Sequence, residues 1–111
     1  MIKEYAPSRG DIVWLDFDPT VGHEQARKRP ALVLSPEPFN KIIKLVLLAP
    51  ITRRVKGLPF EVKLKGTKTE GVILCHQIRT IDYLARGIEF IEKAPKNLVD
   101  DALAKISVLV K

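Results

Sequence analysis

Prolines and glycines interrupt the apolar segments of this chain at short intervals, and this spacing limits the fold more than any other feature. The apolar runs between these breakers are four to seven residues long, which suits strands better than helices. The predicted strands cover residues 11–17, 31–34, 44–50, 59–65, 72–75, 78–81 and 87–91. We therefore expect a mostly β protein, either a small barrel or a half-open sheet.

Two of these segments have informative patterns. Residues 11–17 are apolar at both odd and even positions, which indicates a central strand covered on both faces. In residues 59–65, Phe60, Val62 and Leu64 alternate with charged residues and should point inward. Residues 78–81 could form a strand of their own or continue 72–75 as one bent strand. A single helical turn is expected at 39–41.

The end of the chain has a different period. Apolar residues recur at helical spacing at Val99, Leu103, Ile106 and Val110. Asn97 could cap such a helix. Apolar residues 108–109 widen the stripe beyond one face, which fits either core packing or burial against a partner subunit. One C-terminal helix is therefore expected beside the sheet.

Length and cysteine content narrow the class of protein. With 111 residues, the chain is expected to be a single domain spanning residues 1–111. Its one cysteine, Cys75, cannot form an internal disulfide, which favours a reduced, cytoplasmic protein. The N-terminus lacks the apolar core of a signal peptide, and Leu45–Ile51 is too short to span a membrane.

Positive charge is concentrated in the middle of the chain. The net charge is +6, but residues 23–68 hold only three acidic side chains. The same stretch holds eleven basic side chains: Arg27, Lys28, Arg29, Lys41, Lys44, Arg53, Arg54, Lys56, Lys63, Lys65 and Lys68. This pattern fits a polyanionic partner, either a nucleic acid or an acidic protein, although a solvated basic surface would look the same.

Three segments could carry chemistry. His23, Glu24 and residues 27–29 place an imidazole, a carboxylate and three cations in one predicted loop. RNA cleavage without a metal needs such parts: a base, an acid and a cation beside the phosphate. A polar loop without a catalytic role would have a similar composition. Thr52 follows a predicted strand and precedes Arg53, so it could hydrogen-bond a phosphate or simply end the strand.

The third segment begins with Cys75 and His76. Neighbours on a strand point to opposite faces, so one of them should face the core and a Cys–His nucleophile pair is disfavoured. Two histidines and one cysteine show no metal-ligand spacing, so no metal or other cofactor is expected.

Six motifs stand in an order that resembles a known family. They are Gly10-Asp11-Ile12-Val13-Trp14, Asp16-Phe17-Asp18-Pro19-Thr20, Gly22-His23-Glu24-Gln25, Arg29-Pro30-Ala31-Leu32-Val33-Leu34-Ser35, Pro50-Ile51-Thr52 and Gly71-Val72 with Gln77-Ile78-Arg79. Together they resemble the MazF/PemK toxins of bacterial type II toxin–antitoxin modules, over nearly the whole chain.

The resemblance implies a fold, an activity and partners. The fold would be an SH3-like, CcdB/PemK-type β-barrel with a C-terminal α-helix, assembled as a homodimer. The activity would be sequence-specific, metal-independent cleavage of single-stranded messenger RNA, leaving 2′,3′-cyclic phosphate and 5′-hydroxyl ends. The inhibitor would be a cognate antitoxin whose acidic, flexible tail covers the RNA groove.

The resemblance also assigns roles to individual residues. Arg29 matches the principal catalytic arginine and Thr52 the threonine that works with it at the scissile phosphate. Glu24 matches a glutamate proposed as the base in some members, and His23 a histidine at the active site of PemK-like members. The residues implied in RNA binding are Phe17, Lys28, Arg53, Lys56, His76, Gln77 and Arg79.

One position departs from the family pattern. An aspartate commonly precedes the position of Gln77, whereas this chain has His76 there, and Leu74 stands where PemK-like members have an arginine. We expect His76 either to take over the role of the acid or to change base preference, and we favour the second because Arg29 and Thr52 are retained.

Two other functions remain open at this point. A CcdB-like toxin of the same fold would bind DNA gyrase without catalysis, but such proteins rely on a C-terminal tryptophan, and the single tryptophan here is Trp14. An RNA-binding barrel without activity is the third possibility, and the presence of both Arg29 and Thr52 disfavours it.

Overall fold

The structure, a computed structural model, describes residues 5–16 and 28–111. Within these ranges it contains seven strands and three helices. In chain order they are β1 (Asp11–Asp16), β2 (Lys28–Val33), α1 (Glu37–Ile43), β3 (Val46–Thr52), β4 (Glu61–Lys63), β5 (Val72–Leu74), β6 (Arg79–Ile81), α2 (Tyr83–Arg86), β7 (Glu89–Lys93) and α3 (Lys96–Val110). None of the helices in the described residues is both long and apolar enough to cross a membrane.

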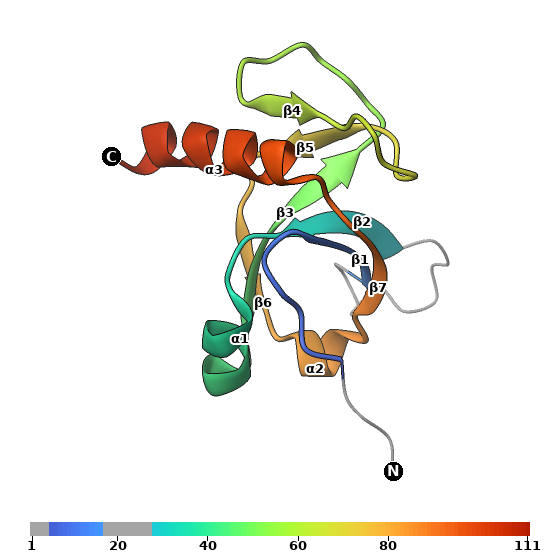
Figure 1. Cartoon of the computed structure of the whole chain (residues 1–111), viewed down its shortest axis with the longest axis vertical. Helices are drawn as coiled ribbons and strands as arrows, with labels where there is room; N and C mark the ends of the chain where they lie inside the picture. Colours follow the sequence, from blue (N-terminus) through green and yellow to red (C-terminus); the bar gives the residue numbers. More distant parts are fainter. Residues whose placement is uncertain (1–4, 17–27) are drawn as a thin grey trace.

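The strands form one antiparallel sheet in the order β4-β5-β3-β2-β1-β7. Strand β3 pairs with β2 on one edge and is shared on the other edge by two short strands. Its beginning pairs with β6, from Val46 opposite Ile81 to Leu48 opposite Arg79, and its end pairs with β5, where Thr52 lies opposite Val72. The sheet therefore coils around β3 into a barrel-like shape, with α3 running across β4 and β5 (Figure 1).

Alternate residues of the central strands feed two separate apolar clusters. Ile12 and Leu32 belong to the cluster under α3, which also contains Leu98, Val99 and Ala102 of that helix. The second cluster occupies the other face of the same strands and is completed by α2. It consists of Val13, Leu15, Ala31, Val33, Val46, Leu48, Ile81 and Tyr83. β1 is thus covered on both faces at Ile12, Val13 and Leu15 and lies between β2 and β7, which confirms its prediction as a central strand.

A buried carboxylate fastens the N-terminal segment to the sheet. Asp11 is only 3% exposed and accepts hydrogen bonds from the Ser8 amide at 3.0 Å and from the Tyr5 hydroxyl. Lys93 Nζ on β7 lies 2.6 Å from the other carboxylate oxygen. Burial raises the pKa of Tyr5, and the hydrogen bond to Asp11 raises it further. The resemblance motif that begins at Gly10 therefore includes a residue with a structural role.

The predicted strands overlap β1 to β7, and 72–75 and 78–81 prove to be separate strands. β2 begins at Lys28, so Lys28 and Arg29 lie on a strand and not in the predicted loop. The cap prediction at Asn97 is wrong. Pro95 occupies the cap position, and its carbonyl accepts the Leu98 amide at 3.0 Å, so the helix begins at Lys96. Along the predicted apolar stripe, Val99 belongs to the core cluster and Leu103 and Ile106 pack against it, whereas Val110 on the last turn of α3 is 72% exposed in the single chain.

Candidate nucleic-acid interface

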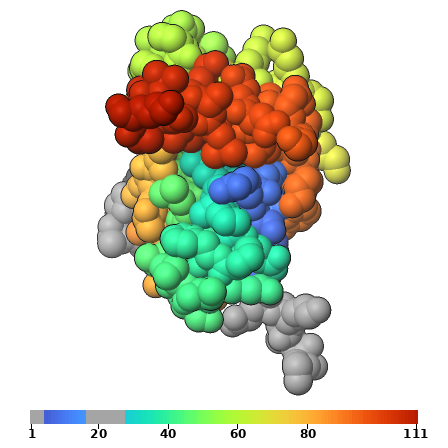
Figure 2. All heavy atoms as spheres, turned by 60° about the vertical axis from the view of Figure 1, so that its left-hand side comes forward, coloured from blue at the N-terminus to red at the C-terminus, as the bar shows by residue number. Residues whose placement is uncertain are grey.

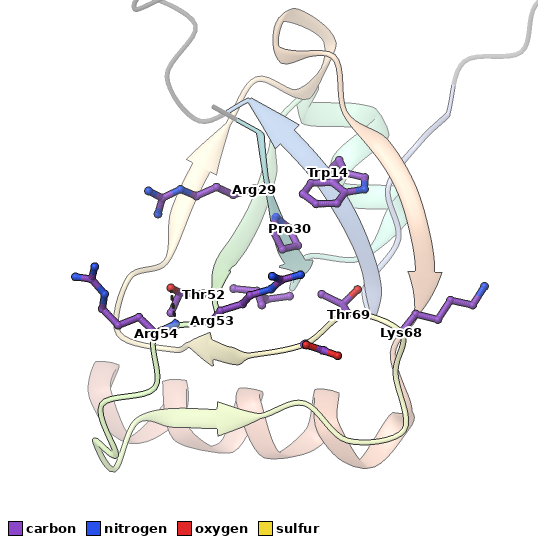
Figure 3. Close-up of a pocket in the computed structure, with 10 residues that line it drawn as sticks. Trp14, Arg29, Pro30, Thr52, Arg53, Arg54, Lys68 and Thr69 are labelled. Carbon is purple, nitrogen blue, oxygen red and sulfur yellow. Dashed lines mark hydrogen bonds between the residues drawn. The ribbon is translucent and has the colours of Figure 1, made fainter. Parts of the chain in front are cut away.

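A groove of about 650 Å³ opens beside the first residues of β2 and the last residues of β3. Its lining residues are Trp14, Arg29, Pro30, Ile51, Thr52, Arg53, Arg54, Lys68, Thr69 and Glu70. Figure 3 shows Arg29, Thr52 and Arg54 at one end and Lys68 at the other, with Arg53 and Thr69 between them. Among the ten lining residues in the described part of the chain, four are cations and one is an acid, so the groove suits an anionic ligand.

The register of β2 and β3 explains why Arg29 and Thr52 share this groove. The ladder pairs Val33 with Leu48 and ends where Ala31 lies opposite Pro50. Two further steps of the same register would set Arg29 opposite Thr52. Pro30 and Pro50 lack amide hydrogens, so neither can donate to the ladder at its end. The two strands are therefore free to diverge at the point where the groove opens.

The Thr52 hydroxyl is oriented by the backbone that follows it. Its Oγ1 accepts the Arg54 amide hydrogen at 3.2 Å, which leaves the hydroxyl hydrogen available for a ligand oxygen (Figure 3). Arg29 is exposed, and no carboxylate within residues 5–16 and 28–111 forms an ion pair with it. A hydroxyl donor and a guanidinium fork that line one groove can both donate to the oxygens of a phosphate.

Of the predicted site residues that the structure describes, the groove brings together Arg29, Thr52 and Arg53, and the other five lie outside its lining. Lys28 precedes Arg29 on β2, and its Nζ lies 3.6 Å from a Glu89 carboxylate oxygen. Lys56 lies in the exposed loop after β3, where the Glu61 carboxylate accepts its amide hydrogen at 3.3 Å. Both lie outside the lining of the groove.

His76, Gln77 and Arg79 also lie outside the groove. His76 and Gln77 form the exposed turn after β5, with the His76 ring centroid 4.1 Å from that of Phe60. Gln77 Nε2 is 3.2 Å from His76 Nε2. Arg79 lies on β6, opposite Leu48. These side chains can meet the ends of an extended ligand rather than its centre.

Cys75 and His76 face in opposite ways, as predicted. Cys75 is fully buried and His76 is exposed, so they form no nucleophile pair. Burial raises the pKa of the Cys75 thiol to about 11, with Lys105 lowering it and Asp101 raising it by smaller amounts. A protonated, buried thiol is a core residue rather than a reactive one.

Two parts of the groove were not identified from the sequence: residues 68–70 and Trp14. Lys68, Thr69 and Glu70 lie between the predicted strands 59–65 and 72–75 and were given no site role, and Trp14 was assigned to a strand. The sequence did contain one signal for a role in anion binding, because Lys68 belongs to the basic stretch 23–68. Trp14 pairs with Pro30 of the neighbouring strand, and both residues line the groove. The Trp14 side chain is 41% exposed there. Phe17, His23 and Glu24 lie outside the described residues.

Comparisons with known proteins identify the family of the chain. The family described as PemK-like, MazF-like toxin of type II toxin–antitoxin system matches residues 8–110. The chain belongs to this family. It is 43% identical over 110 residues to the endoribonuclease toxin MazF of Escherichia coli K12, covering 99% of each chain. It is 36% identical to the endoribonuclease PemK of Escherichia coli, covering 92% of this chain and 80% of PemK.

Solved structures of the family have the same fold. MazF from Deinococcus radiodurans superposes with a TM-score of 0.86 at 40% identity, covering 96% of this toxin and 98% of that chain. A MazE–MazF complex from the same organism gives a TM-score of 0.85 at 35% identity, covering 96% and 97%. The predicted fold class, a mostly β, barrel-like toxin with a C-terminal helix, is therefore confirmed.

Proposed function

We propose that this toxin is a sequence-specific endoribonuclease that cuts single-stranded messenger RNA, acting as a single domain of residues 1–111. The cut would proceed by attack of a ribose 2′-hydroxyl, without a metal ion or other cofactor. The observation that carries the proposal is the meeting of Arg29 and Thr52 in a cationic groove. The endoribonuclease names of relatives that cover almost the whole chain support it.

In this mechanism the 2′-oxygen forms a bond to phosphorus while the bond from phosphorus to the 5′-oxygen breaks. The Arg29 guanidinium neutralises the charge that builds on the non-bridging oxygens, because its planar fork matches two of them. The Thr52 hydroxyl donates to the same phosphate, held in place by the Arg54 amide. The products would be a 2′,3′-cyclic phosphate and a 5′-hydroxyl.

The proposal also needs a base for the 2′-hydroxyl proton and an acid for the leaving 5′-oxygen. Glu24 and His23 are our candidates, because a carboxylate and an imidazole can both exchange protons near neutral pH. They precede Arg29 by five and six residues. In this assignment, residues that precede β2 in the sequence supply the proton-transfer groups, and β2 supplies the cation.

RNA binding would extend from the groove in both directions. Arg53 and Lys68 contact the backbone inside the groove, and Trp14 offers a ring on which a base can stack. The proposed outer contacts are Phe17, Lys28, Lys56, His76, Gln77 and Arg79. Aromatic and amide side chains read unstacked bases, whereas the cations bind phosphates without regard to sequence.

The same groove would bind the acidic, flexible tail of a cognate antitoxin. Its cations attract carboxylates as well as phosphates, so the tail and RNA would compete. The structural similarity to MazF in a MazE–MazF complex supports an antitoxin partner. Messenger RNA and such an antitoxin would meet the toxin in the cytoplasm.

A homodimer is the assembly we propose. Apolar side chains remain exposed on two helices that lie on one face of the molecule (Figure 2). They are Phe39, Ile42 and Ile43 of α1 and Val108, Leu109 and Val110 of α3. A second copy of the chain would remove this apolar surface from water.

Cleavage of a long single-stranded RNA in EDTA tests the function. The wild-type toxin should produce discrete cuts with cyclic phosphate ends, and Arg29→Ala should produce none while keeping its circular dichroism spectrum. Lys105→Ala is the matched control, since it also removes one cation but lies on α3, paired with Asp101. Equal loss in both variants would mean that overall charge, not Arg29, supports cleavage.

The same experiment separates the alternatives. A folded, antitoxin-free toxin that binds RNA without cutting it would be a binding module. A toxin that neither binds nor cuts RNA would revive the gyrase-binding function, which the names of the relatives do not favour. Near-normal cleavage by Arg29→Ala would overturn the proposed mechanism.

A further inference from the structure

The far wall of the groove is a loop between β4 and β5 that is fastened by a residue from another strand. The loop has no regular secondary structure, and residues Lys68, Thr69 and Glu70 line the groove. One oxygen of the Glu92 carboxylate, on β7, accepts the Lys68 amide at 3.0 Å. Its other oxygen accepts the Thr69 amide at 2.8 Å and the Thr69 hydroxyl at 2.7 Å.

A β-bulge accounts for the direction of the Glu92 side chain, which points toward the loop. Ile12 of β1 pairs with Glu92, but the next residue, Val13, pairs with Phe90, so Ile91 is an extra residue in β7. Bulges re-aim the side chains beside them and strengthen the local twist. The carboxylate thus leaves the sheet toward the loop rather than lying over the barrel.

The three hydrogen bonds also favour the ionised form of Glu92. Burial by itself would raise the pKa of this carboxyl, but the Lys68 amide and the Thr69 hydroxyl and amide outweigh it. The attraction of the Lys68 side chain acts in the same direction, and the pKa lies below its usual value. The fastening is therefore a charge-assisted one at neutral pH.

The fastened loop separates two hollows of the surface. One is the groove that contains Arg29 and Thr52. The other is a basin of about 300 Å³, lined by Arg53, Val55, Lys63, Leu64, Thr67, Thr69, Glu70 and Gly71. Arg53, Thr69 and Glu70 line both hollows, so the position of the loop sets the passage between them.

We infer that Glu92 is a positioning residue for RNA binding: by fixing residues 68–70 it sets the site of the nucleotide next to the scissile phosphate. This inference rests on the proposed function. Glu92 is absent from the lining of the groove, and Arg29 and Thr52 are held by β2 and β3 instead. Loosening the loop should therefore weaken substrate binding and lower its sequence selectivity without slowing the chemical step.

The first test needs no RNA. Amide hydrogen exchange at Lys68 and Thr69 should be at least tenfold faster in Glu92→Ala than in wild type. Glu92→Gln should give intermediate exchange, because only one of its two terminal atoms accepts hydrogen bonds. Asp100→Asn is the matched control, since it also removes one carboxylate charge, from an exposed pair with Lys96. Unchanged exchange in Glu92→Ala would overturn the fastening.

The second test measures cleavage of a short RNA by the same variants. Glu92→Ala should raise KM about tenfold, leave kcat within twofold, and reduce selectivity at one nucleotide beside the cut, with Glu92→Gln in between. Faster exchange without any change in KM or selectivity would reduce Glu92 to a structural residue and overturn the inference, as would a loss confined to kcat. Absence of wild-type cleavage would instead count against the proposed function, because the exchange experiment reads the fastening independently.

Discussion

Gly71 and Thr52 touch backbone to backbone: a β-carbon built on Gly71 would lie 2.2 Å from the Thr52 carbonyl oxygen. Gly71 also has a φ of +125°, which side-chain-bearing residues rarely adopt. The contact lies where β5 joins the end of β3, beside the proposed phosphate site. The position of Thr52 thus depends on the lack of a side chain nineteen residues later in the chain.

Gly71→Ala should lower the free energy of unfolding by about 2 kcal/mol or more, from the clash and the strained φ together. It should also reduce cleavage, because relief of the clash shifts Thr52. Gly57→Ala is the control, since Gly57 has a φ of +74° but nothing within 4 Å of a built β-carbon. Urea unfolding of both variants measures the difference. Equal destabilisation would show that strain alone, not the contact with Thr52, requires glycine.

Thr52→Val should reduce kcat about 10²-fold, the scale for loss of one donor to a developing oxyanion. Valine keeps the shape of threonine but has no hydroxyl, so the fold should be retained. Thr52→Ser keeps the donor and should stay within about tenfold of wild type. Single-turnover cleavage of a short RNA measures this. A Thr52→Ser variant as slow as Thr52→Val would argue that the methyl group, not the hydroxyl, is what the site needs.

His76→Asp should change which sequences are cut more than how fast they are cut. His76 is exposed, packs against Phe60 and contacts Gln77, and it does not line the groove that holds Arg29 and Thr52. Sequencing the ends of all products from a long RNA would reveal the shift. A folded His76→Asp variant with no activity would point instead to His76 as an acid or base.

Binding of single-stranded RNA should weaken steeply with salt. If the four cations of the groove each neutralise one phosphate, the affinity should fall about fiftyfold between 50 and 200 mM salt. Arg54→Ala should make the slope of log K against log salt shallower by about 0.7. Antitoxin binding should weaken too, through screening. Titrations with a non-cleavable RNA measure both, and an RNA affinity independent of salt would exclude this groove as the binding site.

Cys75 should resist alkylation at pH 8 in the folded toxin and react readily in urea. With a pKa of about 11, about one thiol in a thousand is ionised at that pH, and the side chain is buried. Mass spectrometry after treatment with iodoacetamide measures the modified fraction. Rapid alkylation of the native toxin would show that β5 opens readily.

The raised pKa of Cys75 also predicts how stability changes in alkali. The unfolded thiol ionises at lower pH than the folded one, so the unfolded state releases its proton first. The stability contributed by the neutral thiol is present below about pH 9 and is lost as the pH rises toward 11. Tyr5, whose pKa is also raised, acts in the same direction at higher pH. Urea unfolding of Cys75→Ala should show a smaller loss between pH 8 and 10 than that of wild type.

The strand and helix predictions succeeded because they depend on local patterns. The alternation in 59–65 and the breakers around 72–75 and 78–81 are properties of neighbouring residues, and β4, β5 and β6 appear there. The short helix α2 escaped prediction because its four residues span too little chain for a helical period. The cap prediction at Asn97 was wrong because α3 begins at Lys96, with Pro95 at the cap position and no side-chain hydrogen bond there, so the start of the helix does not depend on a capping side chain.

The candidate site was predicted less completely. Arg29, Thr52 and Arg53 were identified from motifs, and the groove contains all three. Glu92 and the loop it holds were not identified, because no pattern in residues 89–93 predicts hydrogen bonds to residues 68–69. Trp14 was predicted only as a strand residue. Its exposure to solvent at the groove depends on what packs over that face of the sheet, which the strand pattern does not reveal.

By itself, the sequence determined the short strands, the terminal helix, the basic middle segment and the family. Each of these depends on residue types and their spacing along the chain. Tertiary structure decided which residues come together: the pairing of β2 with β3 puts Arg29 and Thr52 in one groove, Gly71 approaches Thr52, and Glu92 holds the loop of Lys68. Such contacts join residues about twenty apart, and their partners are fixed by pairing and packing of the whole sheet, not by neighbours in the chain.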